Sequence, residues 1–494
     1  MAIAREIAKG AAWVIFCRAL TRGISIISIV ILARLLSPED FGVMALAMAM
    51  IAVMELAGNF SFDVTLIQKQ DATDEHYNTV WTLGLIFQTT IALLLIASAF
   101  PLAAAFDEPQ LAYALIALSS VPLLGGLQNI RVVDFRKHML FHKDFAYLIT
   151  RRLVGFAVTI PLAFYLKSYW ALVIGTIAGH LGGAILSYWL LPYLPRFSFK
   201  HCKELFSFSG WLFFNNILMF FRYQASDIIV GKVAGTASLG IFEVSNQVGD
   251  IATNELIAPI NRAVLPGLSK VNDDPQELSA NFLRIVGVIT LIAVPAGVGI
   301  AAVAEPLVHV GLGEKWLAAI PVITVLGIAS AVGCLETYVS TACLAVGRPD
   351  IVTKLYVVYV TILLTLVTIL TQQFGVVGAA YGWLTAALLN LPLFYTVMLR
   401  AIKVPVRHFI ARVWRPAVAC VIMFLAVRWG LANYAVLTDS VRAIPTLLFA
   451  VAGGFAVYVA SIMTLWFLSG RPVGAERELL DKVASRLPFL RSSA

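Results

Sequence analysis

Long apolar runs dominate the hydropathy pattern of this chain. A helix that spans a bilayer needs roughly 20 mostly apolar residues, and fourteen runs of this kind occur along the sequence. The pattern therefore predicts an all-α polytopic membrane protein with about fourteen transmembrane helices. The runs lie near residues 12–32, 41–66, 80–100, 110–130, 147–166, 169–191, 208–231, 239–265, 284–304, 316–343, 354–373, 376–399, 413–431 and 442–468.

The first twelve runs form two similar halves. Trp13 matches Trp211 at a spacing of 198 residues, and at the same spacing residues 31–42 match residues 229–240 without a gap. Parallel repeats of this kind are typical of transporters, whose halves rock about a site near the middle of the bilayer. We expect four parts: an N-lobe of six helices (1–195), a C-lobe of six helices (196–400), two additional helices (401–468) and a cytoplasmic amphipathic tail (469–494).

Composition and charge fit a protein whose solvent is lipid. The chain is 60% hydrophobic and 13% charged, whereas soluble domains average roughly 45–50% apolar residues. With the N-terminus inside the cell, 26 of the 36 Lys and Arg residues fall in inner segments, including Arg151 and Arg152, and 6 fall in outer ones. Since cytoplasmic loops retain basic residues, both termini are expected in the cytoplasm. The net charge of +8 then follows the membrane sides and does not indicate nucleic-acid binding.

Patterns typical of catalysis or metal binding are absent from the sequence. It contains no P-loop, no nucleophile elbow and no cluster of metal ligands at a recognisable spacing. The five cysteines are scattered, mostly within apolar runs, and fit small hydrophobic core residues better than disulfides or metal ligands. We therefore expect neither an enzyme nor a bound cofactor or metal.

Arginines inside the predicted spans are the first candidates for a binding site. An ionised Arg at the centre of a spanning helix costs about 2.5–3.5 kcal/mol on insertion scales, so such residues face a cavity or a partner. Arg18 and Arg22 lie one turn apart on one face of the first span, and Arg222 and Arg262 lie in the seventh and eighth. Because guanidinium groups bind phosphate bidentately, converging arginines can hold a diphosphate. The alternative is that each Arg snorkels to the surface or pairs with a nearby acid.

A stripe of polar residues follows one face of the eighth span. It can line a cavity for sugar hydroxyls, which need many donors and acceptors, or form a hydrogen-bonded seam between helices. Its members, at i, i+4, i+7, i+11 and i+18, are Glu243, Gln247, Asp250, Asn254 and Asn261. Gln128 and Glu336, at matched positions in the two halves, are further candidates for the lining.

Four carboxylates are candidates for coupling transport to an ion. They are Glu55 and Asp63 in the second span, Asp227 in the seventh and Asp250 in the eighth. Carboxyl groups at membrane depth are typical of proton and cation pathways, but a structural ion pair fits Glu55 and Asp63 equally well. The candidate driving forces are a proton gradient, a sodium gradient and the membrane potential.

Five short motifs add to this pattern along most of the chain. They are ARLLSPEDFG at 33–42, FRKHMLF at 135–141, DIIVG at 227–231, GEKW at 313–316 and VPVRHF at 404–409. Together with the helix layout they resemble the Wzx-type flippases, which are polysaccharide exporters in the PST family of the multidrug/oligosaccharidyl-lipid/polysaccharide (MOP) superfamily.

The resemblance implies a two-lobed, MATE-like fold in the bacterial inner membrane. It implies a flippase that carries an undecaprenyl-diphosphate-linked oligosaccharide outward by alternating access, for exopolysaccharide or lipopolysaccharide assembly. Arginines would hold the diphosphate and the polar stripe would face the sugars. The family architecture implies a monomer among membrane lipids, with polysaccharide polymerase and glycosyltransferase proteins as neighbours.

Two alternatives stay open at this point. One is a MATE-like antiporter of drugs or cations, which would be expected to place a carboxylate deep in its cavity where this chain has Arg18 and Arg22. The other is a non-transporting scaffold of a polysaccharide-assembly complex, which has little reason to retain charges at membrane depth.

Overall fold

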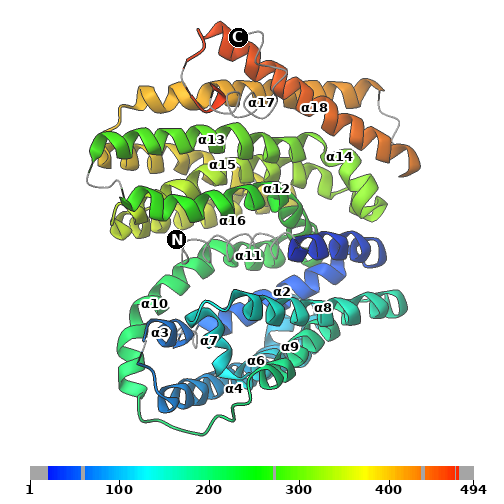
Figure 1. Cartoon of the computed structure of the whole chain (residues 1–494). Helices are drawn as coiled ribbons and strands as arrows, with labels where there is room; N and C mark the ends of the chain where they lie inside the picture. Colours follow the sequence, from blue (N-terminus) through cyan, green and yellow to red (C-terminus); the bar gives the residue numbers. More distant parts are fainter. Residues whose placement is uncertain are drawn as a thin grey trace. The chain divides into compact units, whose positions relative to one another are not determined.

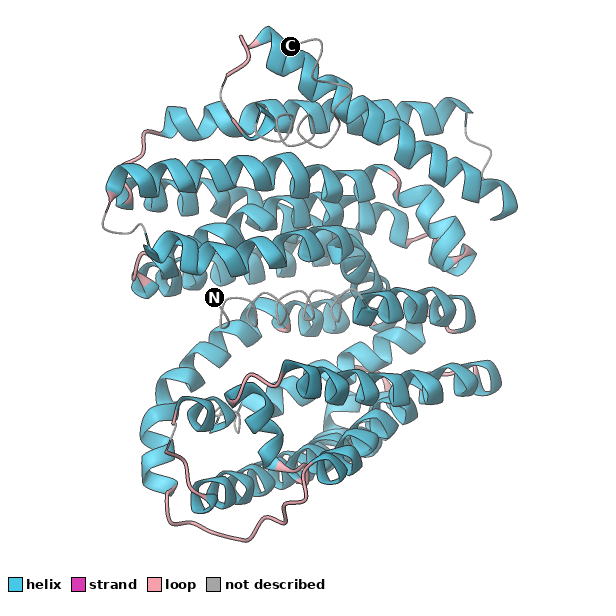
Figure 2. Ribbon diagram, in the orientation of Figure 1, coloured by secondary structure: helices cyan, strands magenta, loops and turns pink. Residues whose placement is uncertain are grey.

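Helices make up the part of the chain that the computed structural model describes, and no strand occurs in that part (Figure 2). By contacts, the chain divides into two compact units, Met1–Glu243 (unit 1) and Val244–Ala494 (unit 2). The predicted all-α class is thereby confirmed, and the lobe limits predicted at 195 and 400 stay predictions. The structure describes residues 20–56, 62–69, 71–270, 274–434, 440–472 and 474–477.

The first helices of unit 1 are residues 20–35, α2 (Pro38–Leu56) and α3 (Phe62–Gln68). A capping box sets the start of α2. The Ser37 N–H donates to Asp40 Oδ2 at 2.9 Å, and the Asp40 N–H donates to Ser37 Oγ at 3.3 Å. Pro38 takes the first helical position, where a missing N–H has no cost. Asp40 Oδ1 also accepts the Tyr169 N–H at 2.7 Å, which ties α2 to the start of α9.

The middle of unit 1 contains two long antiparallel helices, α8 and α9, that lie side by side (Figure 1). The predicted run at 110–130 is broken at Ser119. The hydroxyls of Ser119 and Ser120 donate back to carbonyls of the preceding turn, and Pro122 lacks an N–H. The elements are α4 (Asp74–Ala105), α5 (Pro109–Leu118), α6 (Ser120–Gly126), η1 (Ile130–Val132), α7 (Val133–Lys137), α8 (Phe141–Leu166) and α9 (Trp170–Leu190).

Unit 1 ends with α10 (Cys202–Tyr223), α11 (Ala225–Ala234) and the first part of α12 (Thr236–Lys270). The run at 208–231 is therefore two helices that meet at Gln224. Gly235 has a φ of 85° and makes the turn from α11 into α12.

α2 and α12 start at equivalent positions of the sequence repeat and cross at equivalent glycines. Pro38 and Thr236 are 198 residues apart, as are Gly42 and Gly240. A Cβ on Gly42 would lie 2.5 Å from the Thr236 carbonyl carbon, and a Cβ on Gly240 would lie 2.8 Å from the Pro38 carbonyl carbon. These two contacts are equivalent, so the helix starts pack backbone against backbone around a local two-fold axis. Only glycine permits so close an approach.

Unit 2 is a bundle of long helices whose longest element, α16, contains a sharp bend. Gly375 in α16 has φ 60° and ψ −142°, which divides this element close to the predicted boundary between the runs at 354–373 and 376–399. After α12 its elements are α13 (Pro275–Ala302), α14 (Ala304–Leu307), η2 (Val308–Leu312), η3 (Glu314–Trp316), α15 (Ala319–Ala345), α16 (Pro349–Ala401), α17 (Val406–Tyr434) and α18 (Ser440–Leu468).

Glycines also bring the backbones of α12, α13 and α15 together inside unit 2. A Cβ on Gly297 of α13 would lie 2.8 Å from the carbonyl oxygen of Gly327 in α15, and a Cβ on Gly249 of α12 would lie 3.3 Å from the Gly327 amide nitrogen. Small residues at helix interfaces are the usual means by which membrane helices pack closely.

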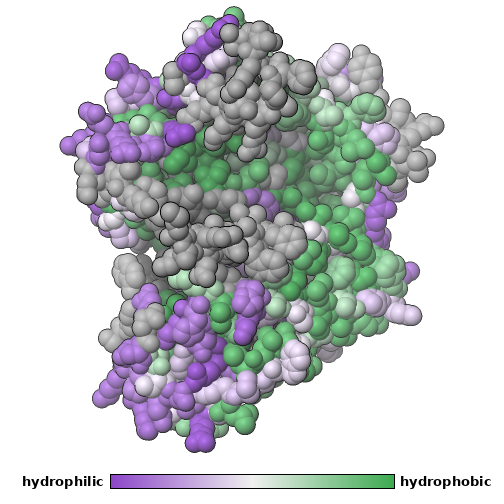
Figure 3. Space-filling view, in the orientation of Figure 1, coloured by the Kyte–Doolittle hydropathy of each residue, from purple (hydrophilic) through white to green (hydrophobic). Residues whose placement is uncertain are grey.

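The surface of the described helices is strongly apolar. Figure 3 shows broad hydrophobic areas on the face in view, with hydrophilic residues gathered in separate patches. Tyr165 and Trp189 are 87% and 80% exposed near the C-terminal ends of the antiparallel α8 and α9, as in the aromatic belts of membrane proteins. In the described part, nine helices are long and apolar enough to cross a bilayer. The chain is a multi-pass membrane protein, while the count of fourteen spans stays a prediction.

Candidate functional site

A serine links the helices that carry two arginines of unit 1. Arg22 lies in the helix of residues 20–35, and Arg152 lies in α8. Arg152 Nη2 donates to Ser25 Oγ, one turn from Arg22, and Ser25 Oγ donates to the Thr21 carbonyl at 2.9 Å. The positive charge of Arg22 acts on Arg152 across this contact. The two arginines that this serine connects are 130 positions apart in the sequence.

Arg151, the neighbour of Arg152 in α8, points to α9. Its Nη2 lies 2.7 Å from His180 Nε2, and because arginine keeps its protons, His180 accepts this hydrogen bond as a neutral imidazole. Tyr147, one turn earlier in α8, also contacts the Arg151 guanidinium. His180 is the middle residue of α9, so the contact lies at the centre of that helix.

A seam of glycines between α8 and α9 creates the space for Arg151. Gly175, Gly179 and Gly183 follow one another at four-residue intervals along α9 and face α8. A Cβ at Gly179 would lie 3.2 Å from the Arg151 carbonyl oxygen, and a Cβ at Gly183 would lie 3.1 Å from Arg151 Cδ. The small residues thus let the arginine side chain extend between the helices toward His180.

In the described part of the chain, no carboxylate hydrogen-bonds to Arg151 or Arg152. Arg152 lies about ten residues, or roughly 15 Å, from the start of α8, and it is exposed beside the exposed Leu148 and Leu153. Within the described residues, the hydrogen-bond partners of Arg151 and Arg152 are the neutral side chains of Tyr147, His180 and Ser25. An exposed guanidinium at this depth requires a polar cavity or an anionic ligand.

The sequence prediction counted Arg151 and Arg152 as basic residues of an inner segment, and the structure places both within the helix α8. Helix α8 begins at Phe141 rather than near residue 147, which moves both arginines toward the middle of the helix. Two adjacent arginines within the apolar run at 147–166 were the available signal. Both arginines stand at the start of that run and were counted with the inner side, because sequence alone does not give the residue at which the helix begins.

Of the four predicted arginines, the structure describes the side chains of Arg22 and Arg222. Arg222 lies near the C-terminal end of α10, is 9% exposed, and has its guanidinium 5.3 Å from the ring centre of Tyr223. Arg18 lies outside the described residues, as do the side chains of Arg262, Asn254 and Trp211. A convergence of all four stays a prediction.

The predicted carboxylates of unit 1 fall at two places. Asp227 is buried in α11, and the charge of Glu243 in α12 acts on it, so these two acids are near each other. Glu55 and Asp63 are half-buried in α2 and α3, and residues 57–61 between those helices lie outside the described chain. Gln128, beyond the end of α6, is also half-buried.

The predicted polar stripe continues into unit 2, where one member lies in a helix seam. Asp250 of α12 accepts a hydrogen bond from Ser330 Oγ of α15. This contact supports the alternative of a hydrogen-bonded seam at that residue. Gln247 and Asn261 are half-buried, and Glu336 is 1% exposed in α15.

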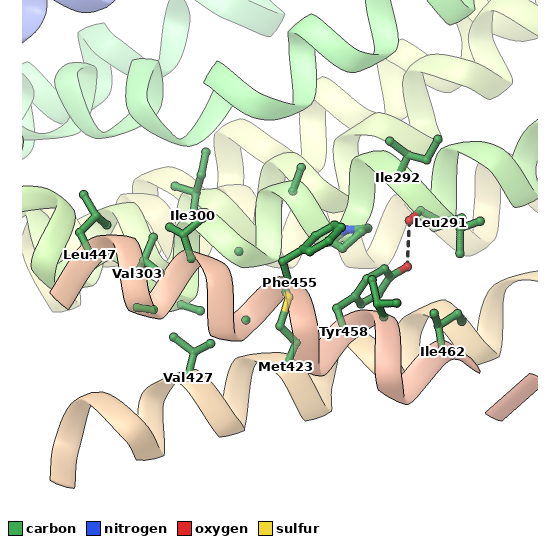
Figure 4. A pocket seen from close by; sticks show the side chains of 18 of the residues that line it. Leu291, Ile292, Ile300, Val303, Met423, Val427, Leu447, Phe455, Tyr458 and Ile462 are labelled. Atoms are coloured by element: carbon green, nitrogen blue, oxygen red, sulfur yellow. Dashed lines mark hydrogen bonds between the residues drawn. The ribbon is translucent and has the colours of Figure 1, made fainter. Parts of the chain in front are cut away.

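An apolar groove of about 750 Å³ lies between α13, α17 and α18 of unit 2 (Figure 4). Side chains such as Ile300, Met423 and Phe455 line it. Tyr458 Oη donates to the Leu291 carbonyl at 2.8 Å, the dashed bond in Figure 4. Among the described residues that line it, Glu476 is the charged one. A groove of this composition suits a hydrocarbon chain.

Comparisons with known proteins agree with this architecture. A family model described as polysaccharide biosynthesis protein matches residues 31–321. The chain is 24% identical over 429 residues to the lipopolysaccharide biosynthesis protein WzxC of Escherichia coli (strain K12), covering 84% of this chain and 86% of WzxC. It is 25% identical over 333 residues to the succinoglycan biosynthesis transport protein ExoT of Rhizobium meliloti (strain 1021), covering 67% of each protein.

Two solved structures show the fold. The lipid II flippase MurJ in its inward closed conformation matches with a TM-score of 0.71 and 16% identity, over 91% of this chain and 98% of that chain. An inward-facing MATE family transporter of the MOP superfamily matches with a TM-score of 0.58 and 13% identity, over 77% and 94%. The predicted MATE-like fold is thereby confirmed.

Proposed function

Because the chain belongs to the family of polysaccharide biosynthesis proteins, whose model matches more than half of its length, we propose that it flips a lipid-linked oligosaccharide across a bacterial inner membrane. The observation that carries the proposal is the hydrogen bond from Arg152 of α8 to Ser25, one turn from Arg22, without a carboxylate on Arg152 among the described residues. Relatives named as polysaccharide and glycan flippases or transporters support it.

The arginines can neutralise the charge of the diphosphate while such a lipid crosses the membrane. A diphosphate cannot enter hydrocarbon without a counter-charge, and a guanidinium supplies one together with paired N–H donors that fit phosphate oxygens. Arg22 and Arg152 provide this chemistry from two helices. Arg151, held by His180, adds positive charge beside them. The substrate proposed for this site is therefore a polyprenyl diphosphate that carries an oligosaccharide.

The groove of unit 2 is the proposed place for the polyprenyl chain. Its lining is apolar, so it offers a hydrocarbon chain the same solvation as lipid while guiding it along α13 and α18. Gly299 of α13 lines the groove, and a Cβ there would meet no atom within 4 Å. This position is open to a side chain that would narrow the groove.

The remaining parts of the proposal rest on the family and on charge distribution. We place both termini in the cytoplasm and expect a monomer that works beside polysaccharide polymerase and glycosyltransferase proteins. Asp227 and Glu243, which lie near each other, are the proposed carboxylates for coupling to a proton or sodium gradient. The polar residues of α12 are proposed to contact sugar hydroxyls.

The test is transport of a labelled polyprenyl-diphosphate oligosaccharide in proteoliposomes. Arg22→Ala and Arg152→Ala should each reduce the transport rate about 10- to 100-fold, because a hydrogen bond to a charged group is worth about 1.5–3 kcal/mol. Arg152→Lys should retain part of the rate, since it keeps the charge and loses the paired donors. The matched control is Arg136→Ala, which removes an exposed arginine of the same unit that pairs with Asp144.

Equal rates for Arg152→Ala and Arg136→Ala would contradict the phosphate role. A wild-type protein that moves no lipid-linked sugar but exchanges organic cations for protons or sodium would establish the antiporter instead. A wild-type protein that transports neither lipid-linked sugar nor organic cations would favour the alternative of a non-transporting scaffold.

A further inference from the structure

The segment between α9 and α10 exposes large apolar side chains although it lies outside the predicted spans. It covers residues 192–201, after the end of α9 at Leu190 and before the start of α10 at Cys202, and Figure 2 draws it as a loop. Its exposed apolar side chains are Leu194, Phe197 and Phe199, at 83%, 71% and 60%. We call residues 192–201 the α9–α10 strap.

Polar contacts hold the other side of the strap on α4. Asn78 Oδ1 accepts hydrogen bonds from Tyr193 Oη at 2.7 Å and from the Arg196 N–H at 2.8 Å. Further along the strap, the Ser198 N–H donates to Thr82 Oγ1 at 3.1 Å. Asn78 and Thr82 are one turn apart, so these contacts follow one face of α4. The strap therefore has a defined conformation, which presents its exposed side chains on a fixed backbone.

The exposed side of the strap is also positively charged. The acids of α4 and α10 that lie beside it already have other partners: Glu75 pairs with Lys200 at 3.1 Å, and Glu204 pairs with Lys69. Arg196 of the strap and Lys203 in the first turn of α10 are exposed, and among the described residues they have no acidic partner. Two unneutralised cations thus accompany the apolar side chains.

The position of the strap in the chain places it at the surface of the bilayer. α9 and α4 are both long and apolar enough to cross a bilayer, and the strap begins at the end of one and lies along the first turns of the other. In hydrocarbon, a non-helical backbone would leave N–H and C=O groups without partners, which excludes the bilayer interior. Aromatic and leucine side chains beside Lys and Arg are typical of segments in the headgroup region.

We propose that the α9–α10 strap binds anionic phospholipids at the membrane surface. Its apolar side chains lie at the boundary between headgroups and acyl chains, and Arg196 and Lys203 contact lipid phosphates. Charge complementarity selects this partner, because an anionic membrane surface attracts basic side chains within a Debye length, about 8 Å at physiological salt. The binding goes beyond the proposed flippase activity and does not depend on it.

The experiment is hydrogen–deuterium exchange of the full chain in lipid nanodiscs, measured at the backbone amides of residues 192–203. Discs of phosphatidylcholine are compared with discs that also contain phosphatidylglycerol with the same acyl chains. In the wild type, phosphatidylglycerol should slow exchange in the strap severalfold, because the anionic surface holds the strap among the headgroups. High salt should reduce this difference, since it screens the attraction.

The double variant Arg196→Gln, Lys203→Gln should lose most of the difference between the two kinds of disc. Each basic side chain near an anionic surface contributes about fivefold to lipid affinity. Both side chains are exposed, so the variant is expected to fold. The matched control is Arg136→Gln with Arg348→Gln, which removes two exposed arginines that each pair with a nearby acid, and it should behave as the wild type.

A second variant tests the apolar part of the contact. Leu194→Ser with Phe199→Ser should speed exchange of the strap in both kinds of disc, because the side chains that insert below the headgroups are lost. Equal exchange of the wild-type strap with and without phosphatidylglycerol would overturn the proposal. So would protection by phosphatidylglycerol that Arg196→Gln, Lys203→Gln retains in full.

Discussion

The crossing of α2 and α12 makes a sharp prediction about stability. Gly42→Ala adds a Cβ that would lie 2.5 Å from the Thr236 carbonyl carbon and 3.2 Å from the Gly240 amide nitrogen. Carbon atoms in good contact are about 3.5–4.0 Å apart, so the two helices must separate by roughly 1 Å. The atoms that the Cβ meets belong to backbone, which cannot rotate aside as a side chain can. Gly240→Ala has the equivalent effect on the Pro38 carbonyl.

The expected change in the free energy of unfolding is the difference between an overpacking cost and a gain in helix stability. Overpacking of a close contact costs about 1–3 kcal/mol, and replacing a helical glycine with alanine returns about 0.5–1 kcal/mol. Each single variant should therefore lose about 1–2 kcal/mol of unfolding free energy. At about 2–4 °C per kcal/mol for a unit of some 240 residues, this corresponds to a Tm lower by about 2–8 °C.

The measurement is thermal unfolding in detergent of Gly42→Ala, Gly240→Ala, the double variant and the control Gly84→Ala. Gly84 lies in α4, and a Cβ there would meet no atom within 4 Å, so its variant should be neutral or slightly stabilised. The double variant should lose less than the sum of the single losses, because one separation of the helices relieves both contacts. A Tm for Gly42→Ala equal to or above that of Gly84→Ala would refute the reasoning.

Three further predictions follow from the site, the groove and the end of unit 2. Gly299→Trp should slow transport in proteoliposomes severalfold, because the new side chain fills the groove, whereas Leu425→Trp, on an exposed part of α17 outside the groove lining, should not. Equal transport rates for the two variants would exclude the groove as the binding place of the polyprenyl chain. Gly183→Val should lower transport without a large loss of Tm, since its side chain displaces Arg151 from His180; an unchanged rate would show that this placement is unimportant. Glu476→Gln should lower the free energy of unfolding by about 3–5 kcal/mol, because it leaves Arg415 charged and buried without its partner. The double variant Arg415→Met, Glu476→Leu should recover most of the lost Tm. An unchanged Tm in Glu476→Gln would contradict a stabilising buried ion pair.

Local patterns in the sequence determined much of the architecture. In the described residues, apolar runs of membrane length fell on helices, because the thickness of the bilayer sets the length of an apolar helix that crosses it. The bend at Gly375 fell at a predicted boundary, and the 198-residue repeat anticipated the equivalent starts of α2 and α12. Ser37 and Asp40 set the start of α2 through a capping box, which is a local interaction.

Other boundaries depended on interactions that hydropathy does not record. The run at 110–130 is interrupted at Ser119, and the run at 208–231 is interrupted at Gln224. An interruption of one or two residues barely changes the mean hydropathy of a run. The start of α8 at Phe141 likewise lies before the apolar part of that helix, and this changed the depth assigned to Arg152.

Only the tertiary structure decided which polar residues meet. Arg152 and its hydrogen-bond partner Ser25 are 127 residues apart, so no short motif contains both. His76 and His201, whose rings stack, are 125 residues apart. Periodicity fixes which residues share a face of one helix, but not which helix that face contacts. The stripe placed Asp250 on a cavity or in a seam, and only the structure shows that it accepts a hydrogen bond from Ser330 of α15. The composition and length of a segment determine whether it can form a membrane-spanning helix, whereas the helices that it contacts are determined by tertiary packing.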